Sequence, residues 1–121
     1  MAENTWDGAT DTDWNTAGNW NTTGVTDRVP TADDDVIIPN VSNDPVIGTG
    51  LNPTVNSITI YNNGRLTLGN NTVTIDGENG TRCIDIDGQW TTTNSTVVLT
   101  TGADTDIAGN YGDAGGQAVP F

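Results

Sequence analysis

The sequence predicts an all-β fold: a short, right-handed, three-sided β-solenoid (β-helix) that forms one domain over residues 1–121. Three observations favour this fold. Apolar and polar residues alternate in short runs, and each run ends in Asn, Asp or Gly residues that suit turns. The runs recur after about two dozen residues, as in stacked repeats. Three tryptophans precede the first run and are available to close one end of the stack.

Residues 1–35 are expected to form an N-terminal cap. Their few large apolar side chains stand in a stretch that is otherwise rich in Thr, Asn, Gly and Asp. A segment this polar orders itself only by packing those side chains onto something larger. The expected structural residues of the cap are Trp6, Gly8, Trp14, Asn19, Trp20 and Pro30.

Residues 36–100 are expected to form the coils. Three strand-like runs are followed, one repeat later, by three matching runs, and Val36–Ile38 precedes the first of them by a similar distance. Val46 and Ile47 likewise lie about one repeat before Leu66. Stretches this short are too brief for helices. The matched runs are Ser57–Ile60 with Cys83–Ile86, Arg65–Leu68 with Gln89–Thr92, and Thr72–Ile75 with Thr96–Leu99.

Stacking of the coils would place like side chains above one another, because a single coil cannot bury its own inward residues. The expected contacts are Ile58 with Ile84, Leu66 with Trp90, and Val73 with Val97. A ladder of this kind needs only two apolar residues per strand, which fits a chain that is 33% hydrophobic. The expected ladder comprises Ile58, Ile60, Leu66, Leu68, Val73, Ile75, Ile84, Ile86, Trp90, Val97 and Leu99.

An antiparallel β-sandwich is the alternative fold, since strands at this spacing also suit hairpins. Turn sequences such as Asn62-Asn63-Gly64 would serve in a hairpin equally well. The recurrence of the three runs at a fixed spacing favours the solenoid, because an antiparallel sandwich does not require its strands to repeat at a fixed period.

Residues 101–121 are expected to form an irregular C-terminal segment because of their glycine content. Val119 and Phe121 are candidate assembly contacts, which would dock either on a neighbouring subunit or on the last coil of the same chain.

Composition narrows the possible partners. Sixteen acidic residues against three Arg and no Lys give a net charge of -13. This charge argues against binding to nucleic acid and disfavours anionic membrane surfaces. The one cysteine, Cys83, has no second cysteine with which to form an intrachain disulfide. The N-terminal residues lack the basic and apolar regions of a signal peptide, so export by that route is not expected if the native chain begins here.

The chain also lacks most catalytic side chains. Without His or Lys there is no catalytic triad of the Ser-His-Asp type, no His-ligated metal and no Schiff-base chemistry. Asp85 and Asp87 could serve as a carboxylate pair but are expected to be solvated. Asp11 with Asp13, Asp33–Asp35, and Asp104 with Asp106 are candidate calcium ligands that match no known calcium loop. We expect a protein that is not an enzyme and has no cofactor.

The pattern of the first three-quarters of the chain resembles two groups of proteins. One group comprises β-helical modules of secreted bacterial surface and adhesin-like proteins, and the other comprises small virion structural proteins of tailed bacteriophages. The matching residues are Trp6, Gly8, Trp14, Asn19, Trp20, Pro30, Asp35, Val36–Pro39 and Val55–Ile75.

The resemblance implies one of two non-enzymatic functions. An acidic β-domain that stands alone without an export signal favours a capsid decoration (cement) or fibre-like protein at the virion surface. Its partners would be the capsid shell or copies of itself in a homo-oligomer. The alternative is a module of a secreted surface adhesin or extracellular fibre. A polysaccharide-active enzyme built on a similar solenoid is a third, remote alternative.

Overall fold

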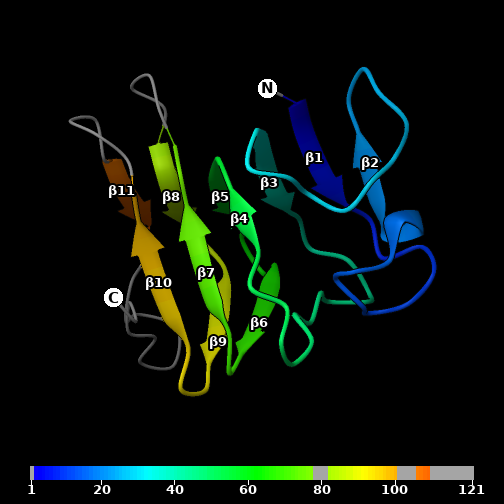
Figure 1. Ribbon diagram of the computed structural model, residues 1–121. Helices are drawn as coiled ribbons and strands as arrows, with labels where there is room; N and C mark the ends of the chain where they lie inside the picture. The colour runs from blue at the N-terminus through cyan, green and yellow to red at the C-terminus, as the bar shows by residue number, and fades with distance from the viewer. Residues whose placement is uncertain (1, 78–81, 101–105, 110–121) are drawn as a thin grey trace.

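The computed structural model describes residues 2–77, 82–100 and 106–109, which form eleven strands and one short 3₁₀ helix, η1 (Ala17–Asn19) (Figure 1). The predicted all-β fold is therefore confirmed. The first sheet has the spatial order β11 (Asp106–Gly109), β8 (Arg82–Ile86), β5 (Ser57–Ile60), β3 (Asp34–Ile38), β1 (Ala2–Trp6) and β2 (Trp20–Thr22). The second consists of β10 (Thr96–Leu99), β7 (Thr72–Ile75) and β4 (Thr54–Val55), and the third of β6 (Arg65–Gly69) and β9 (Gln89–Thr92).

Strand pairing follows the repeat in the sequence. Strands β5, β6 and β7 are consecutive in the chain yet belong to three different sheets. Each pairs in parallel with the strand one repeat later, namely β8, β9 and β10. The registers place Ile58 opposite Ile84, Leu66 opposite Trp90, and Val73 opposite Val97, as the repeat predicts. Among the described strands only β1 and β2 pair antiparallel. The strand-like runs of the repeat therefore do not form the hairpins that an antiparallel sandwich would require.

The core consists of inward side chains from all three sheets, with two such residues on strands such as β5 and β8, where Ile58 lies opposite Ile84 and Ile60 opposite Ile86. Because side chains alternate across a strand, every second residue of β3, β5, β6 and β7 is turned inward and buried. All expected ladder residues are buried except Leu99, which is only partly buried. Leu99 lies in β10 at the end of the second sheet, where no described strand pairs with its outer side.

The segment before β4 joins the third sheet through a single bridge. Val46 forms a parallel bridge with Thr67, and the Ile47 amide donates to the Thr67 carbonyl. Ile47 is 2% exposed, whereas Val46 is 39% exposed. A shift of one residue would exchange the two faces of this segment, so the burial of Ile47 fixes its register.

The N-terminal residues extend the sheets as well as covering them. β1 pairs in parallel with β3, and β2 then pairs antiparallel with β1 at the edge of the first sheet. Asp13 forms a parallel bridge with Val46, which continues the pairing of the third sheet. The expected cap is thus partly an additional layer of strands.

The expectation of an irregular segment over residues 101–121 is wrong for residues 106–109. These residues form β11, which pairs in parallel with β8 through an irregular register at its start. An uncovered β8 would leave a row of backbone N–H and C=O groups unpaired, and β11 supplies their partners. Val119 and Phe121 lie outside the described residues. Within those residues no helix is long and apolar enough to cross a bilayer.

Candidate functional site

The three N-terminal tryptophans pack edge to face. The Trp6 and Trp20 ring centroids are 5.1 Å apart at an interplanar angle of 81°, and those of Trp14 and Trp20 are 4.8 Å apart at 78°. This geometry matches the electrostatic preference of aromatic pairs. The Trp6 Nε1 group donates to the Asn43 carbonyl at 2.6 Å, and the Trp20 Nε1 group donates to the Trp14 carbonyl at 2.8 Å. The three tryptophans that the sequence assigns to the cap are thereby brought together.

Gly8 and Asn19 hold the turn that joins the tryptophans. Gly8 has a φ of +60°, and a Cβ at this position would lie 2.7 Å from the Asn43 carbonyl oxygen. The buried Asn19 side chain accepts hydrogen bonds from the Thr10 and Asp11 amides and donates to the Asp11 carboxylate at 2.6 Å. Both residues are structural.

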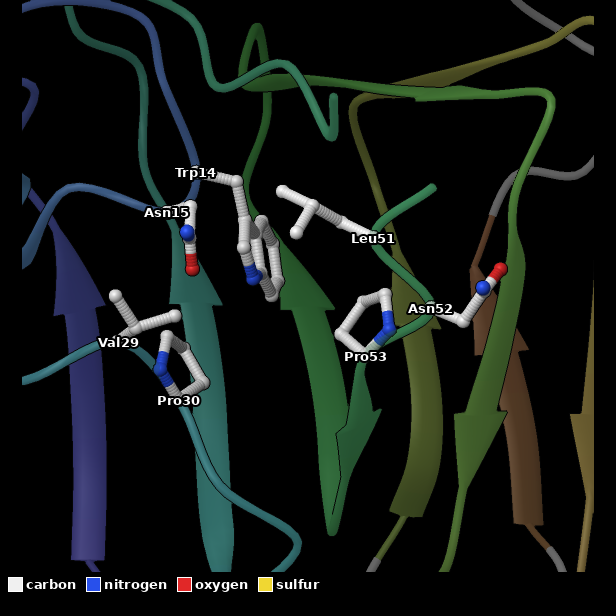
Figure 2. Close-up of a pocket in the computed structure, with 7 residues that line it drawn as sticks. All are labelled: Trp14, Asn15, Val29, Pro30, Leu51, Asn52 and Pro53. Atoms are coloured by element: carbon white, nitrogen blue, oxygen red, sulfur yellow. The ribbon is translucent and has the colours of Figure 1, made fainter. Parts of the chain in front are cut away.

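A pocket of about 250 Å³ opens beside the tryptophan cluster. Figure 2 shows Val29 and Pro30 on one side, Leu51 and Pro53 on the other, and the indole of Trp14 between them. Asn15 and Asn52 complete the lining, and both are exposed. None of the seven lining residues carries a charge, although the chain as a whole is strongly acidic.

The indole nitrogen of Trp14 is turned toward this pocket. In Figure 2 it lies on the ring edge that faces the space between the two apolar sides. Trp6 and Trp20 each donate to a carbonyl oxygen, whereas no hydrogen bond of the Trp14 Nε1 group is found within the described part of the chain. Trp14 is nevertheless only 1% exposed. The pocket therefore presents, between apolar sides, one N–H donor that no described residue accepts from.

The sequence pattern marked Trp14 and Pro30 but not the other side of the pocket. Leu51 and Pro53 stand in an irregular loop before β4, so no strand pattern identifies them. The repeat itself contained the signal, because Leu51 and Pro53 follow Val29 and Pro30 at about the repeat length. Residues one repeat apart are neighbours in a stacked fold.

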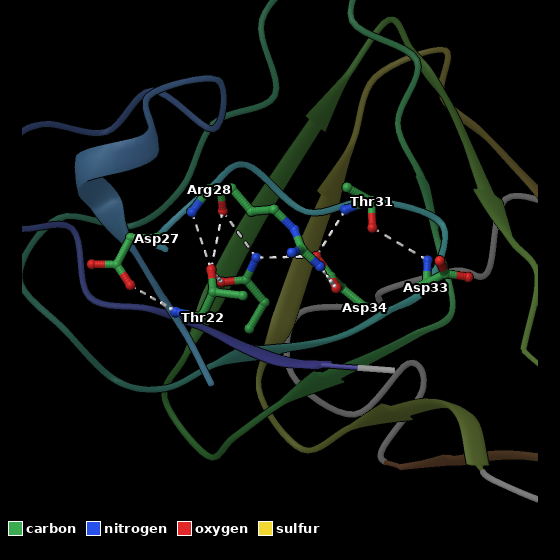
Figure 3. A network of polar contacts seen from close by, with 7 residues as sticks. Thr22, Asp27, Arg28, Thr31, Asp33 and Asp34 are labelled. Atoms are coloured by element: carbon green, nitrogen blue, oxygen red, sulfur yellow. Dashed lines mark hydrogen bonds and ion pairs between the residues drawn. The ribbon is translucent and has the colours of Figure 1, made fainter. Parts of the chain in front are cut away.

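A polar network lies under the loop that leads into β3 (Figure 3). Arg28 Nη2 lies 2.6 Å from Asp34 Oδ1, and the other oxygen of this buried carboxylate accepts from the Thr31 amide and from Asn4 Nδ2. Neighbouring Asp35 accepts from the side chains of Asn56 and Ser57. Two of the three carboxylates in the run that could have bound calcium, those of Asp34 and Asp35, thus accept hydrogen bonds within the protein.

Asp11 and Asp13 also serve local structure. The Asp11 carboxylate accepts from the Asp13 amide, and the Asp13 carboxylate accepts from the Asn15 amide, both at 2.9 Å. The hydrogen bond from Asn19, followed by that from the Asp13 amide, lowers the pKa of Asp11 below its ordinary value. In the described ranges no three Asp, Glu or Cys side chains converge as a metal site would require. Asp104 and the side chain of Asp106 lie outside what the structure describes.

The remaining candidates from the sequence are scattered. Asp85 is half-buried on the outer face of β8 and Asp87 is exposed in the following turn, so they do not line a common pocket. Cys83 and Trp90 are buried in the core.

Comparison with known proteins places the chain in a family but gives no individual relative. The family model for a domain of unknown function, DUF8693, matches residues 5–110. The chain belongs to this family. No curated protein and no solved structure matches it.

Proposed function

We propose that this DUF8693 domain is a non-enzymatic structural protein of a virion surface, a capsid decoration (cement) or fibre-like protein built on a right-handed three-sided β-solenoid. Its partners would be the capsid shell and copies of itself. The observation that carries the proposal is the parallel pairing of strands one repeat apart in all three sheets. Fold alone does not determine function, so the charge and the site must support the same conclusion.

The order of the strands supports a solenoid. The chain passes from β5 in the first sheet to β6 in the third and β7 in the second, and then returns to the first sheet with β8. The same circuit is repeated by β8, β9 and β10, after which β11 returns to the first sheet. One circuit per repeat with parallel stacking is how a three-sided solenoid is built.

The surface and the interior support a structural function over a catalytic one. The apolar side chains of the ladder are buried, and the carboxylates of Asp11, Asp34 and Asp35 hold turns and loops. A net charge of -13 keeps copies apart in solution, so assembly requires a specific contact. Val119 and Phe121 remain our candidates for that contact.

A module of a secreted bacterial surface adhesin or fibre is the second candidate function. The observation that favours it is the uncharged pocket beside Trp14, because a surface module recognises its target through such a site. The genes next to this one distinguish the two candidates. Capsid and portal genes would support the virion protein, and a longer reading frame with a secretion signal would support the adhesin.

Native mass spectrometry and sedimentation of the purified chain test the proposal. We expect an oligomer whose mass is a multiple of 12.6 kDa. Phe121→Asp should dissociate it, whereas Val25→Asp, at a half-exposed position in the cap, should not. A chain that stays monomeric, and that does not sediment with purified capsids from the same source, would contradict the proposal.

A further inference from the structure

We propose that the pocket beside Trp14 binds a short, extended segment of a partner protein. An uncharged apolar side chain of that segment, of the Pro or Leu type, would lie between the two sides of the pocket. A backbone carbonyl next to it would accept a hydrogen bond from the Trp14 Nε1 group. This inference takes one point from the proposed assembly function, namely that the partner is a protein.

The indole N–H group of Trp14 has no acceptor among the described residues, and it opens onto the pocket rather than being sealed in the core. The indole N–H groups of buried tryptophans usually donate to a carbonyl or another acceptor. Trp6 and Trp20 follow this rule, with carbonyl acceptors at 2.6 Å and 2.8 Å. Trp14 is buried as deeply, yet its nitrogen faces the pocket (Figure 2). A ligand that brings an acceptor to this point would use the donor that the described residues leave unpaired.

The two sides of the pocket are stiff. Pro30 and Pro53 have fixed rings, and Val29 is branched at Cβ, so little side-chain entropy is lost when a ligand binds between them. The Asn52 carboxamide is held in place because its Oδ1 accepts from the Thr72 amide at 2.9 Å. A volume of about 250 Å³ is smaller than most drug-sized sites, but it is suited to one or two side chains of a peptide.

The lining of the pocket favours a peptide over a sugar. Sugar rings stack on an open aromatic face, and Trp14 is 1% exposed. A sugar also carries several hydroxyl groups, each of which needs a polar partner, whereas five of the seven lining residues are Trp, Val, Leu or Pro. A peptide needs one donor for its carbonyl and apolar contacts for its side chain, which is what the pocket offers.

Charge narrows the peptide class further. The lining is uncharged, but the surrounding chain carries a net charge of -13. Acidic residues beside the bound side chain would be repelled, while basic residues would be attracted. The partner segment is therefore apolar at its centre and neutral or basic at its flanks.

Titrations followed by ¹H–¹⁵N correlation spectra test the inference, since each of the four tryptophans gives one indole N–H signal. The probes are acetyl-Arg-Pro-Leu-Pro-Arg-amide, its Glu-flanked counterpart, and N-acetylglucosamine. We expect the Arg-flanked peptide to shift the Trp14 signal saturably, with weaker binding of the Glu-flanked peptide and no binding of the sugar. Trp14→Phe keeps an aromatic ring, removes the donor, and assigns the signal.

Variants on each side of the pocket separate the donor from the apolar contacts. Trp14→Phe should weaken peptide binding about fivefold, the value of one hydrogen bond. If that variant does not fold, Leu51→Ala, at a partly buried position, tests the apolar side and should weaken binding to a similar extent. Tyr61→Phe, outside the pocket, should change nothing.

A Trp14 signal that neither peptide shifts, or that the sugar shifts as much, overturns the inference. The native mass is measured separately, so an oligomer with an unresponsive pocket overturns this inference alone. A monomer whose pocket binds the Arg-flanked peptide supports this inference while contradicting the self-assembly part of the proposed function.

Discussion

Arg28 and Asp34 form an ion pair in which the two partners differ in burial. The Nη2–Oδ1 distance is 2.6 Å, and the side chain of Asp34 is fully buried while that of Arg28 is 36% exposed. The pair connects the loop after β2 with the start of β3, and Asn4 of β1 contacts both residues. Strand β1, the loop after β2 and the start of β3 are thus joined by a carboxylate that has no access to water.

Removal of the guanidinium should therefore destabilise the protein strongly. We expect Arg28→Ala to lower the free energy of unfolding by about 2–4 kcal/mol, because Asp34 remains buried without its counter-charge. Urea unfolding followed by tryptophan fluorescence measures the effect. Arg65→Ala is the matched control, since Arg65 is exposed on β6, and it should change stability by less than about 0.5 kcal/mol. Equal effects of the two variants would show that the ion pair contributes nothing.

The parallel register of the third sheet can be tested by cross-linking. Thr67 of β6 lies opposite Thr91 of β9, and neither side chain is buried. Neighbouring strands bring Cα atoms within the range that a disulfide spans. The double variant Thr67→Cys/Thr91→Cys should therefore form a disulfide under mild oxidation, detected by mass spectrometry without reductant. Thr67→Cys combined with Thr74→Cys places the thiols in different sheets and should stay reduced.

Alanine substitutions at two glycines with positive φ, Gly24 and Gly8, can distinguish the cost of backbone strain from the cost of a steric clash. Gly24 has a φ of +81°, and a Cβ added there would meet no atom within 4 Å, so Gly24→Ala should cost only about 1 kcal/mol. Gly8→Ala adds a conflict with the Asn43 backbone and should cost about 3 kcal/mol or more. Thermal unfolding of both variants gives the comparison. Similar melting temperatures would mean that the Gly8 turn is not closely packed against Asn43.

The lowered pKa of Asp11 predicts a pH-dependent contribution to stability. A carboxyl group whose pKa is lower in the folded than in the unfolded state stabilises the fold fully above the unfolded pKa, here 3.8. That contribution is lost as the pH falls through the folded pKa. Asp11→Asn should therefore be less stable than the wild type at neutral pH, and the difference should shrink below pH 3.8. Urea midpoints at several pH values measure it, and a difference that does not change with pH would contradict the prediction.

The ladder was predictable because it depends on local alternation and on one repeat length. Each inward residue of β5, β6 and β7 is marked by its polar neighbours, and the matching runs supply the partner strand. The spacing could not predict that Ile47, and not Val46, is the buried residue. The two apolar residues are adjacent, so the segment shows no alternation that would tell the inward side from the outward side.

The pocket and the ion pair were not predictable in the same way. Both depend on where irregular loops cross, and neither Leu51 nor Arg28 belongs to a periodic run. The pairing of Arg28 with Asp34, in preference to Asp33 or Asp35, depends on which carboxylate the start of β3 turns inward. Such choices are made by tertiary packing and leave no periodic pattern.

The antiparallel strand β2 forms one edge of the first sheet. On the free side of this strand the Thr22 amide already donates to the Asp27 carboxylate at 3.0 Å, and the Trp20 amide donates to the Ala17 carbonyl. A second molecule therefore finds no free donor at these two positions, which opposes end-to-end growth into fibrils on that side. An added strand would have to pair with this side of β2 without the Trp20 and Thr22 donors, so we expect the first sheet to end at β2 rather than to continue into another molecule.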